Sequence, residues 1–257
     1  ITNRLFRDVS AWYHLVVAVD TTQGTAANRV KIYVNGVQET SFATETYPSQ
    51  NYDTYINDDV KHTLAGSYTE DSQRFEGYWA DTNLIDGLQL TPTSFGEFKN
   101  GVWIPINTSG LTFGTNGFRL QFKQVGVGTA SSTTIGADTS GNNNHYTSTN
   151  IVASDCALPD SPENNFCTWN PLTAGAQNTF TEGNLKLASV WSADLSGNAS
   201  TFFPESGKWY WELRIDGANT YPYIGITSQE KLNDTVNGGT FYNIAWHAGG
   251  TGQNSGS

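Results

Sequence analysis

The sequence has no methionine, no long apolar run and little charge. None of its 257 residues is Met and the chain begins at Ile1, so we expect a piece of a longer protein, cut at both ends. The longest apolar run, residues 15–19, is far shorter than the roughly 20 residues that cross a bilayer, and we expect no membrane insertion. Charged residues form 14% of the chain, against about 25% in an average domain.

Positive charge and cysteine are scarce as well. Thirteen Lys and Arg face 24 Asp and Glu, which gives a net charge of -11. Such a surface repels nucleic-acid phosphates, so we expect no nucleic-acid partner. It attracts cations, which keeps calcium as the candidate cofactor, although an acidic surface often serves only solubility. Cys156 and Cys167 leave one disulfide or two free thiols as open alternatives.

Thr, Ser, Asn, Gly and aromatic residues take the place of charge, and they favour strands and turns over helices. Residues 12–20 predict a strand that is buried on both faces. Asn35-Gly36, between two apolar runs, predicts a two-residue hairpin turn. Apolar residues alternate with polar ones along 118–123 and 209–216, which predicts two strands and places Trp209 and Trp211 in a core.

These patterns predict an all-β fold, with two antiparallel β-sandwich (jelly-roll-like) domains joined by an irregular connector. Residues 124–185 contain no Lys or Arg and are dense in Gly, Ser, Thr and Asn, which is typical of a connector. We therefore expect a first domain at 1–95, a strand-poor connector at 96–185 and a second domain at 186–257.

Three sets of motifs resemble known families. Residues 12–16, 30–36 and 75–86 resemble the later part of a laminin-G-like, concanavalin-type jelly roll. Further segments resemble phage virion proteins that carry this jelly roll, and two resemble the opening of a SPRY-type β-sandwich. The phage-like segments are residues 84–97, 114–118, 138–144, 160–166 and 169–172, and the SPRY-like ones are 207–212 and 223–226.

The combined order of jelly roll, connector and SPRY-like start implies a structural or adhesive protein of a phage virion, such as a tail fibre on the virion surface. The resemblance implies binding to a host-surface glycan or receptor, contacts with other virion subunits, and a homo-oligomer, with a trimer favoured. A secreted, non-viral glycan-binding adhesion module is the alternative. A third, weaker alternative is an accessory part of a polysaccharide-degrading enzyme.

Two oxygen-rich loops are candidate calcium sites. The first contains Asp138, Ser140, Asn142 and Asn144 around a glycine, and the second contains Asp53 and Asp58. Carboxylate, hydroxyl and amide oxygens are the ligands that calcium prefers. The alternatives are a turn closed by side-chain hydrogen bonds for the first loop and a solvated polar loop for the second.

Aromatic side chains are the candidate ligand-binding groups, because an exposed ring can stack on a sugar. If 74–87 form a strand, Tyr78 and Trp79 point to opposite faces, so at most one is exposed. A place in the core is the alternative for every candidate, since burying such a ring is strongly favourable. The candidates are Tyr78, Trp79, Tyr221 and Trp246.

No catalytic residues are predicted, and we expect that the chain is not an enzyme. The closest run to a glycosidase motif is residues 212–216, where Glu212, Arg214 and Asp216 share a face. A retaining glycosidase needs two carboxylates about 5 Å apart, and here an arginine separates them. No nucleophile elbow or phosphate-binding loop occurs in the sequence.

Overall fold

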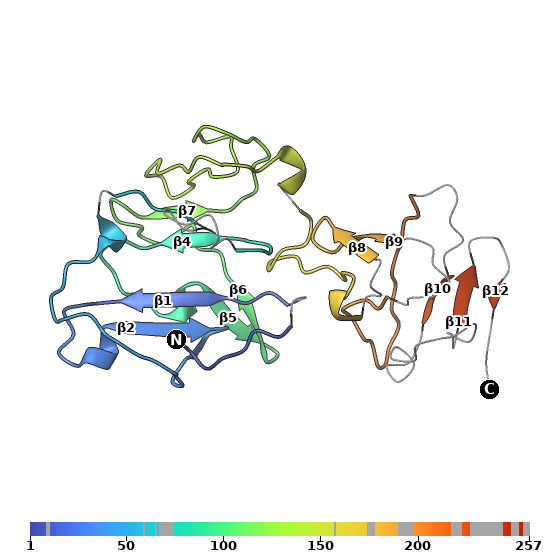
Figure 1. Cartoon of the computed structure of the whole chain (residues 1–257), viewed down its shortest axis with the longest axis horizontal. Coiled ribbons are helices and arrows are strands. Elements are labelled where there is room, and N and C mark those ends of the chain that lie inside the picture. The colour runs from blue at the N-terminus through green and yellow to red at the C-terminus, as the bar shows by residue number, and fades with distance from the viewer. Residues whose placement is uncertain are drawn as a thin grey trace. The chain divides into compact units, whose positions relative to one another are not determined.

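The computed structural model confirms an all-β chain (Figure 1). Within the described ranges, the only helical elements are single 3-10 turns of three residues each. None of these turns is long or apolar enough to cross a membrane. The structure describes residues 1–8, 11–58, 60–64, 66, 75–156, 158–173, 178–189, 198–216, 223–226, 244–247 and 252–253.

The chain forms two compact units, the first of residues 1–7 and 11–166, the second of residues 8–10 and 167–257. Residues 96–166, most of the stretch that we expected to be a connector, belong to the first unit. The first unit contains β1 (Leu15–Val19), β2 (Val30–Val34), β3 (Val37–Gln38), β4 (Thr82–Leu84), β5 (Gly96–Lys99), β6 (Val102–Pro105) and β7 (Phe118–Leu120). The second contains β8 (Asn178–Thr181), β9 (Lys186–Ser189), β10 (Tyr223–Ile226), β11 (Ile244–His247) and β12 (Gly252–Gln253).

Strands β1, β2 and β3 form an antiparallel sheet in that order. The predicted turn is confirmed: Asn35 and Gly36 join β2 to β3 with φ of 48° and 78°, the pair of positive values that a two-residue hairpin requires. The prediction that the first strand is buried on both faces is wrong, because Leu15 and Val17 are 58% and 62% exposed. The face that these two residues share is therefore open to solvent.

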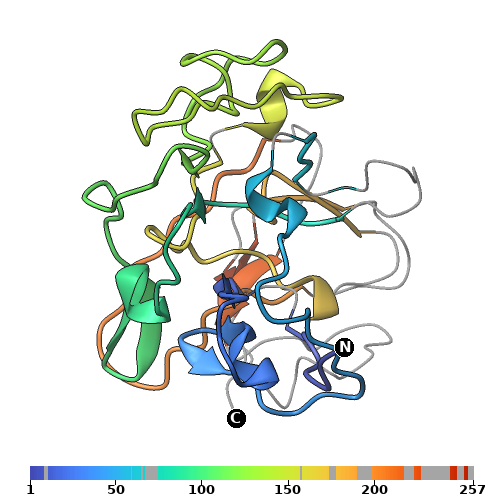
Figure 2. The same ribbon diagram turned by 90° about the vertical axis from the view of Figure 1, so that its left-hand side faces the viewer.

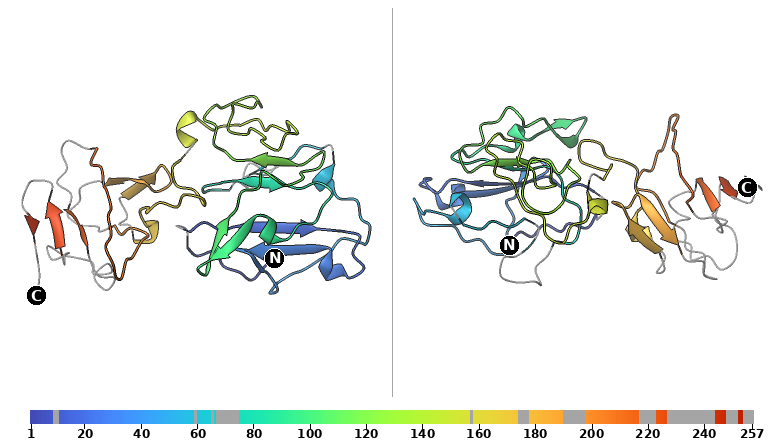
Figure 3. Two further views of the ribbon diagram at one scale, coloured as in Figure 1. Left: turned by 180° about the vertical axis from the view of Figure 1, so that it is seen from behind. Right: turned by 90° about the horizontal axis from the view of Figure 1, so that it is seen from above.

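The core of the first unit lies around β4 and β7, an antiparallel pair that Figures 1 and 3 show at a different level from β1 and β2. Leu120 is fully buried, and Phe118 is 6% exposed. The predicted alternation is confirmed for Phe118 and Leu120. The strand ends at Leu120 rather than at residue 123, and Phe122 has a φ of 54°, outside the strand conformation. The polar side of β7 is buried too, since Arg119 is only 7% exposed. The other apolar residues of this core are Phe113, Ile135 and Ala137.

Strands β5 and β6 form a hairpin that packs on the turn of the first sheet (Figure 2). The indole of Trp103, in β6, stacks on His14 with ring centroids 5.8 Å apart. Its Nε1 donates a hydrogen bond of 3.0 Å to His14 Nδ1. Burial lowers the pKa of His14, which keeps the imidazole neutral and able to accept this bond.

The second unit contains the pair β8–β9 and the antiparallel sheet β10–β11–β12. The prediction of a strand over residues 209–216 is wrong, because the segment has no strand partner in the described part of the unit. Trp209 and Trp211 are 64% and 52% exposed, so their predicted place in a core is wrong as well. Alternation fixes which side chains share a face, but a face is buried only where another layer covers it.

We predict that Gly36→Ala destabilises the protein more than Gly101→Ala. Both glycines follow an Asn in a two-residue turn and have φ near 80°, so each alanine incurs the same backbone strain of about 1–2 kcal/mol. A Cβ at Gly36 would also overlap the ring of Trp103, whereas nothing lies within 4 Å at Gly101. Urea unfolding should show about 1–3 kcal/mol of additional loss for Gly36→Ala. Equal losses would mean that Trp103 does not pack on this turn.

Candidate functional site

The polar side of β7 is covered by the segment around Thr108. The register of the β4–β7 pair places Asn83 opposite Arg119. Arg119 Nε donates a 2.9 Å hydrogen bond to Thr108 Oγ1, and this hydroxyl donates one of 3.0 Å to Asn83 Oδ1. Thr108 is 1% exposed. The hydrogen bonds that bring Thr108 onto the strand therefore explain why a face that the sequence predicts to be solvated is buried.

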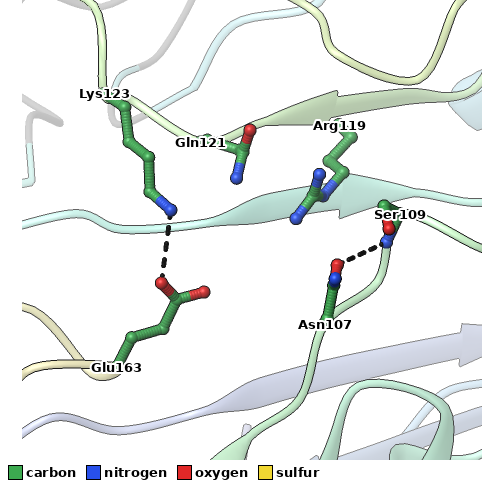
Figure 4. A pocket seen from close by; sticks show the side chains of 6 residues that line it. All are labelled: Asn107, Ser109, Arg119, Gln121, Lys123 and Glu163. Carbon is green, nitrogen blue, oxygen red and sulfur yellow. Dashed lines mark hydrogen bonds and ion pairs between the residues drawn. The ribbon is translucent and has the colours of Figure 1, made fainter.

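A polar cleft of about 360 Å³ opens beside this network (Figure 4). Its volume lies at the lower end of the roughly 300–1,000 Å³ that is usual for small-molecule sites. Every described side chain that lines it is polar or charged. The lining residues are Asn107, Ser109, Arg119, Gln121, Lys123 and Glu163.

Of the two cationic side chains described in the cleft, Lys123 has an ion-pair partner and Arg119 has none. Lys123 Nζ lies 3.2 Å from Glu163 Oε2, and both of these side chains are about half exposed. The buried Arg119 guanidinium makes one hydrogen bond, from Nε, and its two terminal nitrogens have no acceptor among the described residues. Figure 4 shows the guanidinium reaching into the space between Asn107 and Gln121. The cleft therefore presents an unpaired cationic fork beside a neutralised lysine.

Asp81 is a half-buried carboxylate whose pKa responds to the charges of this cleft. Burial raises its pKa, Arg119 opposes this rise, and the charges of Glu163 and Lys123 act in opposite directions. Its Oδ1 is buried without a hydrogen-bond partner in the described part of the chain. Its φ of 41° is a left-handed value that Asp tolerates, and it lies just before the start of β4.

Asp138 holds the other end of Arg119 in place. Its Oδ1 accepts the backbone N–H groups of Arg119 and Ser140, both at 2.8 Å. Its Oδ2 accepts the hydroxyl of Ser140 at 2.8 Å and the N–H of Asn144 at 2.9 Å. Burial by itself would raise the pKa of this carboxyl, but the four hydrogen bonds outweigh burial and lower it. The carboxylate is therefore the centre of a closed turn.

The side-chain amides of the same loop bind it to the segment that leads into β7. Asn142 Nδ2 donates to the carbonyls of Gly114 and Gly117, at 2.6 and 2.9 Å. Asn144 Nδ2 donates to the carbonyls of Thr115 and Gly117, at 3.2 and 2.9 Å. The structure thus brings together all four residues predicted for the first calcium site, and their contacts are those of the alternative, a turn closed by side-chain hydrogen bonds.

The second predicted calcium loop lies elsewhere in the first unit. Asp53 and Asp58 flank the 3-10 turn Tyr55–Asn57, and both are exposed. The carbonyl of Asp58 contacts His62 Nε2 at 3.2 Å. Among the described residues, no three His, Cys, Asp or Glu side chains gather closely enough to hold a metal ion. Calcium binding at either loop remains a prediction.

Of the four predicted ligand-binding aromatics, the structure places two at the surface. Tyr78 and Trp79 are 43% and 44% exposed, and the expectation that at most one faces solvent is wrong because the segment forms no strand before Thr82. Trp79 Nε1 donates to Thr82 Oγ1 at 2.5 Å, and its ring meets Phe75 edge to face, 5.4 Å between centroids. Tyr221 lies outside the described residues, and of Trp246 only the backbone, in β11, is described.

The two carboxylates of the glycosidase-like run, in the second unit, bind side chains only two residues away along the chain. Glu212 accepts a hydrogen bond from the hydroxyl of Tyr210, and Asp216 forms a two-point pair with Arg214, at 2.6 and 3.1 Å. Both cysteines are free thiols, with Cys156 buried and Cys167 exposed.

Comparison of the chain with protein-family models, with curated proteins and with solved structures finds no match. The site therefore rests on its own geometry. Sequence reasoning missed Asn107, Ser109 and Glu163 as site residues, because the pattern along the chain does not show which distant segments meet. It placed Arg119 on a solvated strand face, since alternation does not reveal that Thr108 covers this face.

We predict that Asp138→Asn destabilises the protein by roughly 2–4 kcal/mol, because the amide keeps a single acceptor oxygen and turns N–H groups toward backbone donors. Urea unfolding at neutral pH measures the loss. Asp53→Asn, which changes an exposed carboxylate in the other predicted loop, is the matched control and should change stability by less than about 0.5 kcal/mol.

The Asp138 hydrogen bonds also predict a dependence on pH. Because its pKa is lower in the folded chain than the ordinary 3.8, its contribution is complete above that value and disappears as the pH falls through the folded pKa. Unfolding curves of the wild type and Asp138→Asn should therefore converge in strong acid. A stability difference that does not change with pH would show that the carboxylate charge is not what the turn requires.

Proposed function

We propose that the chain is a structural and adhesive part of a phage virion, a tail fibre or surface appendage that binds a host-surface glycan or receptor. The observation that carries this is the order of its motifs: laminin-G-like segments, then the phage-like segments, then the SPRY-like opening. The finer fold that goes with the proposal is two antiparallel β-sandwich domains, the first of jelly-roll type and the second of SPRY type. The proposal includes contacts with other virion subunits and assembly into a homotrimer.

The fold supports a binding role through its loops. The strands of the first unit are short, and long irregular segments between them are held by side-chain-to-backbone hydrogen bonds such as those of Asp138 and Asn142. Loops fixed in this way on a β scaffold can present polar groups to a ligand while the scaffold stays folded. The polar cleft and the exposed pair Tyr78 and Trp79 are the surfaces that suit a glycan.

A secreted, non-viral adhesion module is the alternative, since the jelly-roll motifs alone fit both. Mass spectrometry of purified phage particles and of host envelope fractions separates the two. Peptides of this chain in particles support the virion proposal. Peptides confined to an envelope or secreted fraction would overturn it in favour of the adhesion module.

We predict that Trp79→Ala weakens binding of the whole chain to host cells or to their isolated surface polysaccharide by about tenfold, because an exposed indole offers a large flat surface to a sugar ring. Tyr55→Ala is the control, since Tyr55 is 69% exposed on a separate loop of the same unit. Binding is measured by surface plasmon resonance on immobilised polysaccharide. Equal binding by both variants would remove Trp79 from the site.

A further inference from the structure

The buried guanidinium of Arg119 lacks a counter-ion in contact with it. Among the described residues, no carboxylate lies within ion-pair distance, and Thr108 accepts only from Nε. Arg119 lines the cleft, so a ligand that enters the cleft can reach the terminal nitrogens of its guanidinium. The four terminal N–H groups form a planar fork that matches the two oxygens of a carboxylate.

The surroundings of this fork favour a ligand with hydroxyl groups. Asn107, Ser109 and Gln121 line the cleft with amides and a hydroxyl, which both donate and accept hydrogen bonds. Among the described residues no apolar side chain lines the cleft, which disfavours a peptide or lipid ligand.

We propose that this cleft binds a sugar carboxylate, a uronic acid residue of a polysaccharide, with the carboxylate on the Arg119 fork and the ring hydroxyls on the surrounding amides. The assignment rests on the proposed glycan-binding function and names the class of sugar. A neutral sugar would leave the guanidinium unpaired. The volume of about 360 Å³ is sufficient for one sugar unit with its water.

Glu163 sets the strength of this site. It neutralises Lys123 and places a negative charge at the rim of the cleft. The negative charge of Glu163 repels a ligand carboxylate. Lys123 attracts the ligand carboxylate fully only when its ion pair with Glu163 is broken. Removing the Glu163 charge should therefore improve binding of an acidic sugar, an effect that loss of structure would not produce.

The test is a titration of the whole chain with D-glucuronate and with D-glucuronamide, its neutral isostere, followed by NMR at constant ionic strength. Glucuronate should bind at least about tenfold more tightly than the amide. Glu163→Gln should tighten glucuronate binding by about threefold, and Lys123→Gln should weaken it by about threefold, with little effect on the amide. Lys99→Gln, an exposed lysine of the β5–β6 hairpin, is the control and should change neither.

Arg119→Lys should abolish the preference for glucuronate, since an ammonium group cannot form the two-point contact. Circular dichroism checks that this variant folds, and the Glu163→Gln and Lys123→Gln results stand if it does not. Equal binding of glucuronate and glucuronamide, or weaker glucuronate binding by Glu163→Gln, would overturn the proposal.

A parallel titration with a soluble polyuronate distinguishes failure of this proposal from failure of the proposed function. Tighter binding of a soluble polyuronate than of the monosaccharide identifies a polysaccharide as the source of the uronate and supports the proposal as stated. If the chain binds host polysaccharide but shows no preference for uronate, the acidic-sugar assignment fails while the adhesive function stands. If it prefers uronate but is absent from virions, the virion proposal fails while the site stands.

Discussion

Arg119 connects the segments of the first unit, and the polar side of β7 depends on it. Its backbone N–H donates to Asp138, and its carbonyl accepts the N–H and hydroxyl of Thr139, at 2.8 and 3.1 Å. Its side chain reaches Thr108, which in turn donates to Asn83. One residue thus links β4, β7, the loop at 107–109 and the turn at 138–144. Each of these groups is hydrogen-bonded to the next, so each partner is constrained by the others.

The same network gives the cleft its chemistry. Because Asp138 and Thr108 fix the backbone and Nε of Arg119, the terminal nitrogens are held in place with no acceptor in the described part of the chain. Preorganised donors of this kind bind without first losing side-chain freedom. The overall charge of -11 repels acidic polymers at long range, whereas the cleft attracts a carboxylate only at short range. Added salt screens the long-range repulsion more than the short-range attraction, so the attraction should become relatively more important as salt rises.

Much of the local structure could be predicted from the sequence, and the site could not. The Asn35-Gly36 turn follows from the conformational preferences of two adjacent residues, and the apolar side of β7 follows from alternation. The burial of Arg119 depends on Thr108, eleven residues away, and the cleft also needs Glu163, which is still further along the chain. Trp209 and Trp211 show the converse: their alternation is regular, but they are exposed. Pairing between distant segments decides both cases.

Native-state hydrogen exchange tests most directly whether the Asp138–Arg119 network organises the first unit. The amides of Arg119, Ser140 and Asn144 all donate to one carboxylate, so they should be protected together and should exchange through a single opening that also exposes Leu120. In Asp138→Asn, all three should lose protection together while the amides paired between β1 and β2 keep theirs. Independent exchange of the three amides, or rapid exchange of Arg119 in the wild type, would contradict the account.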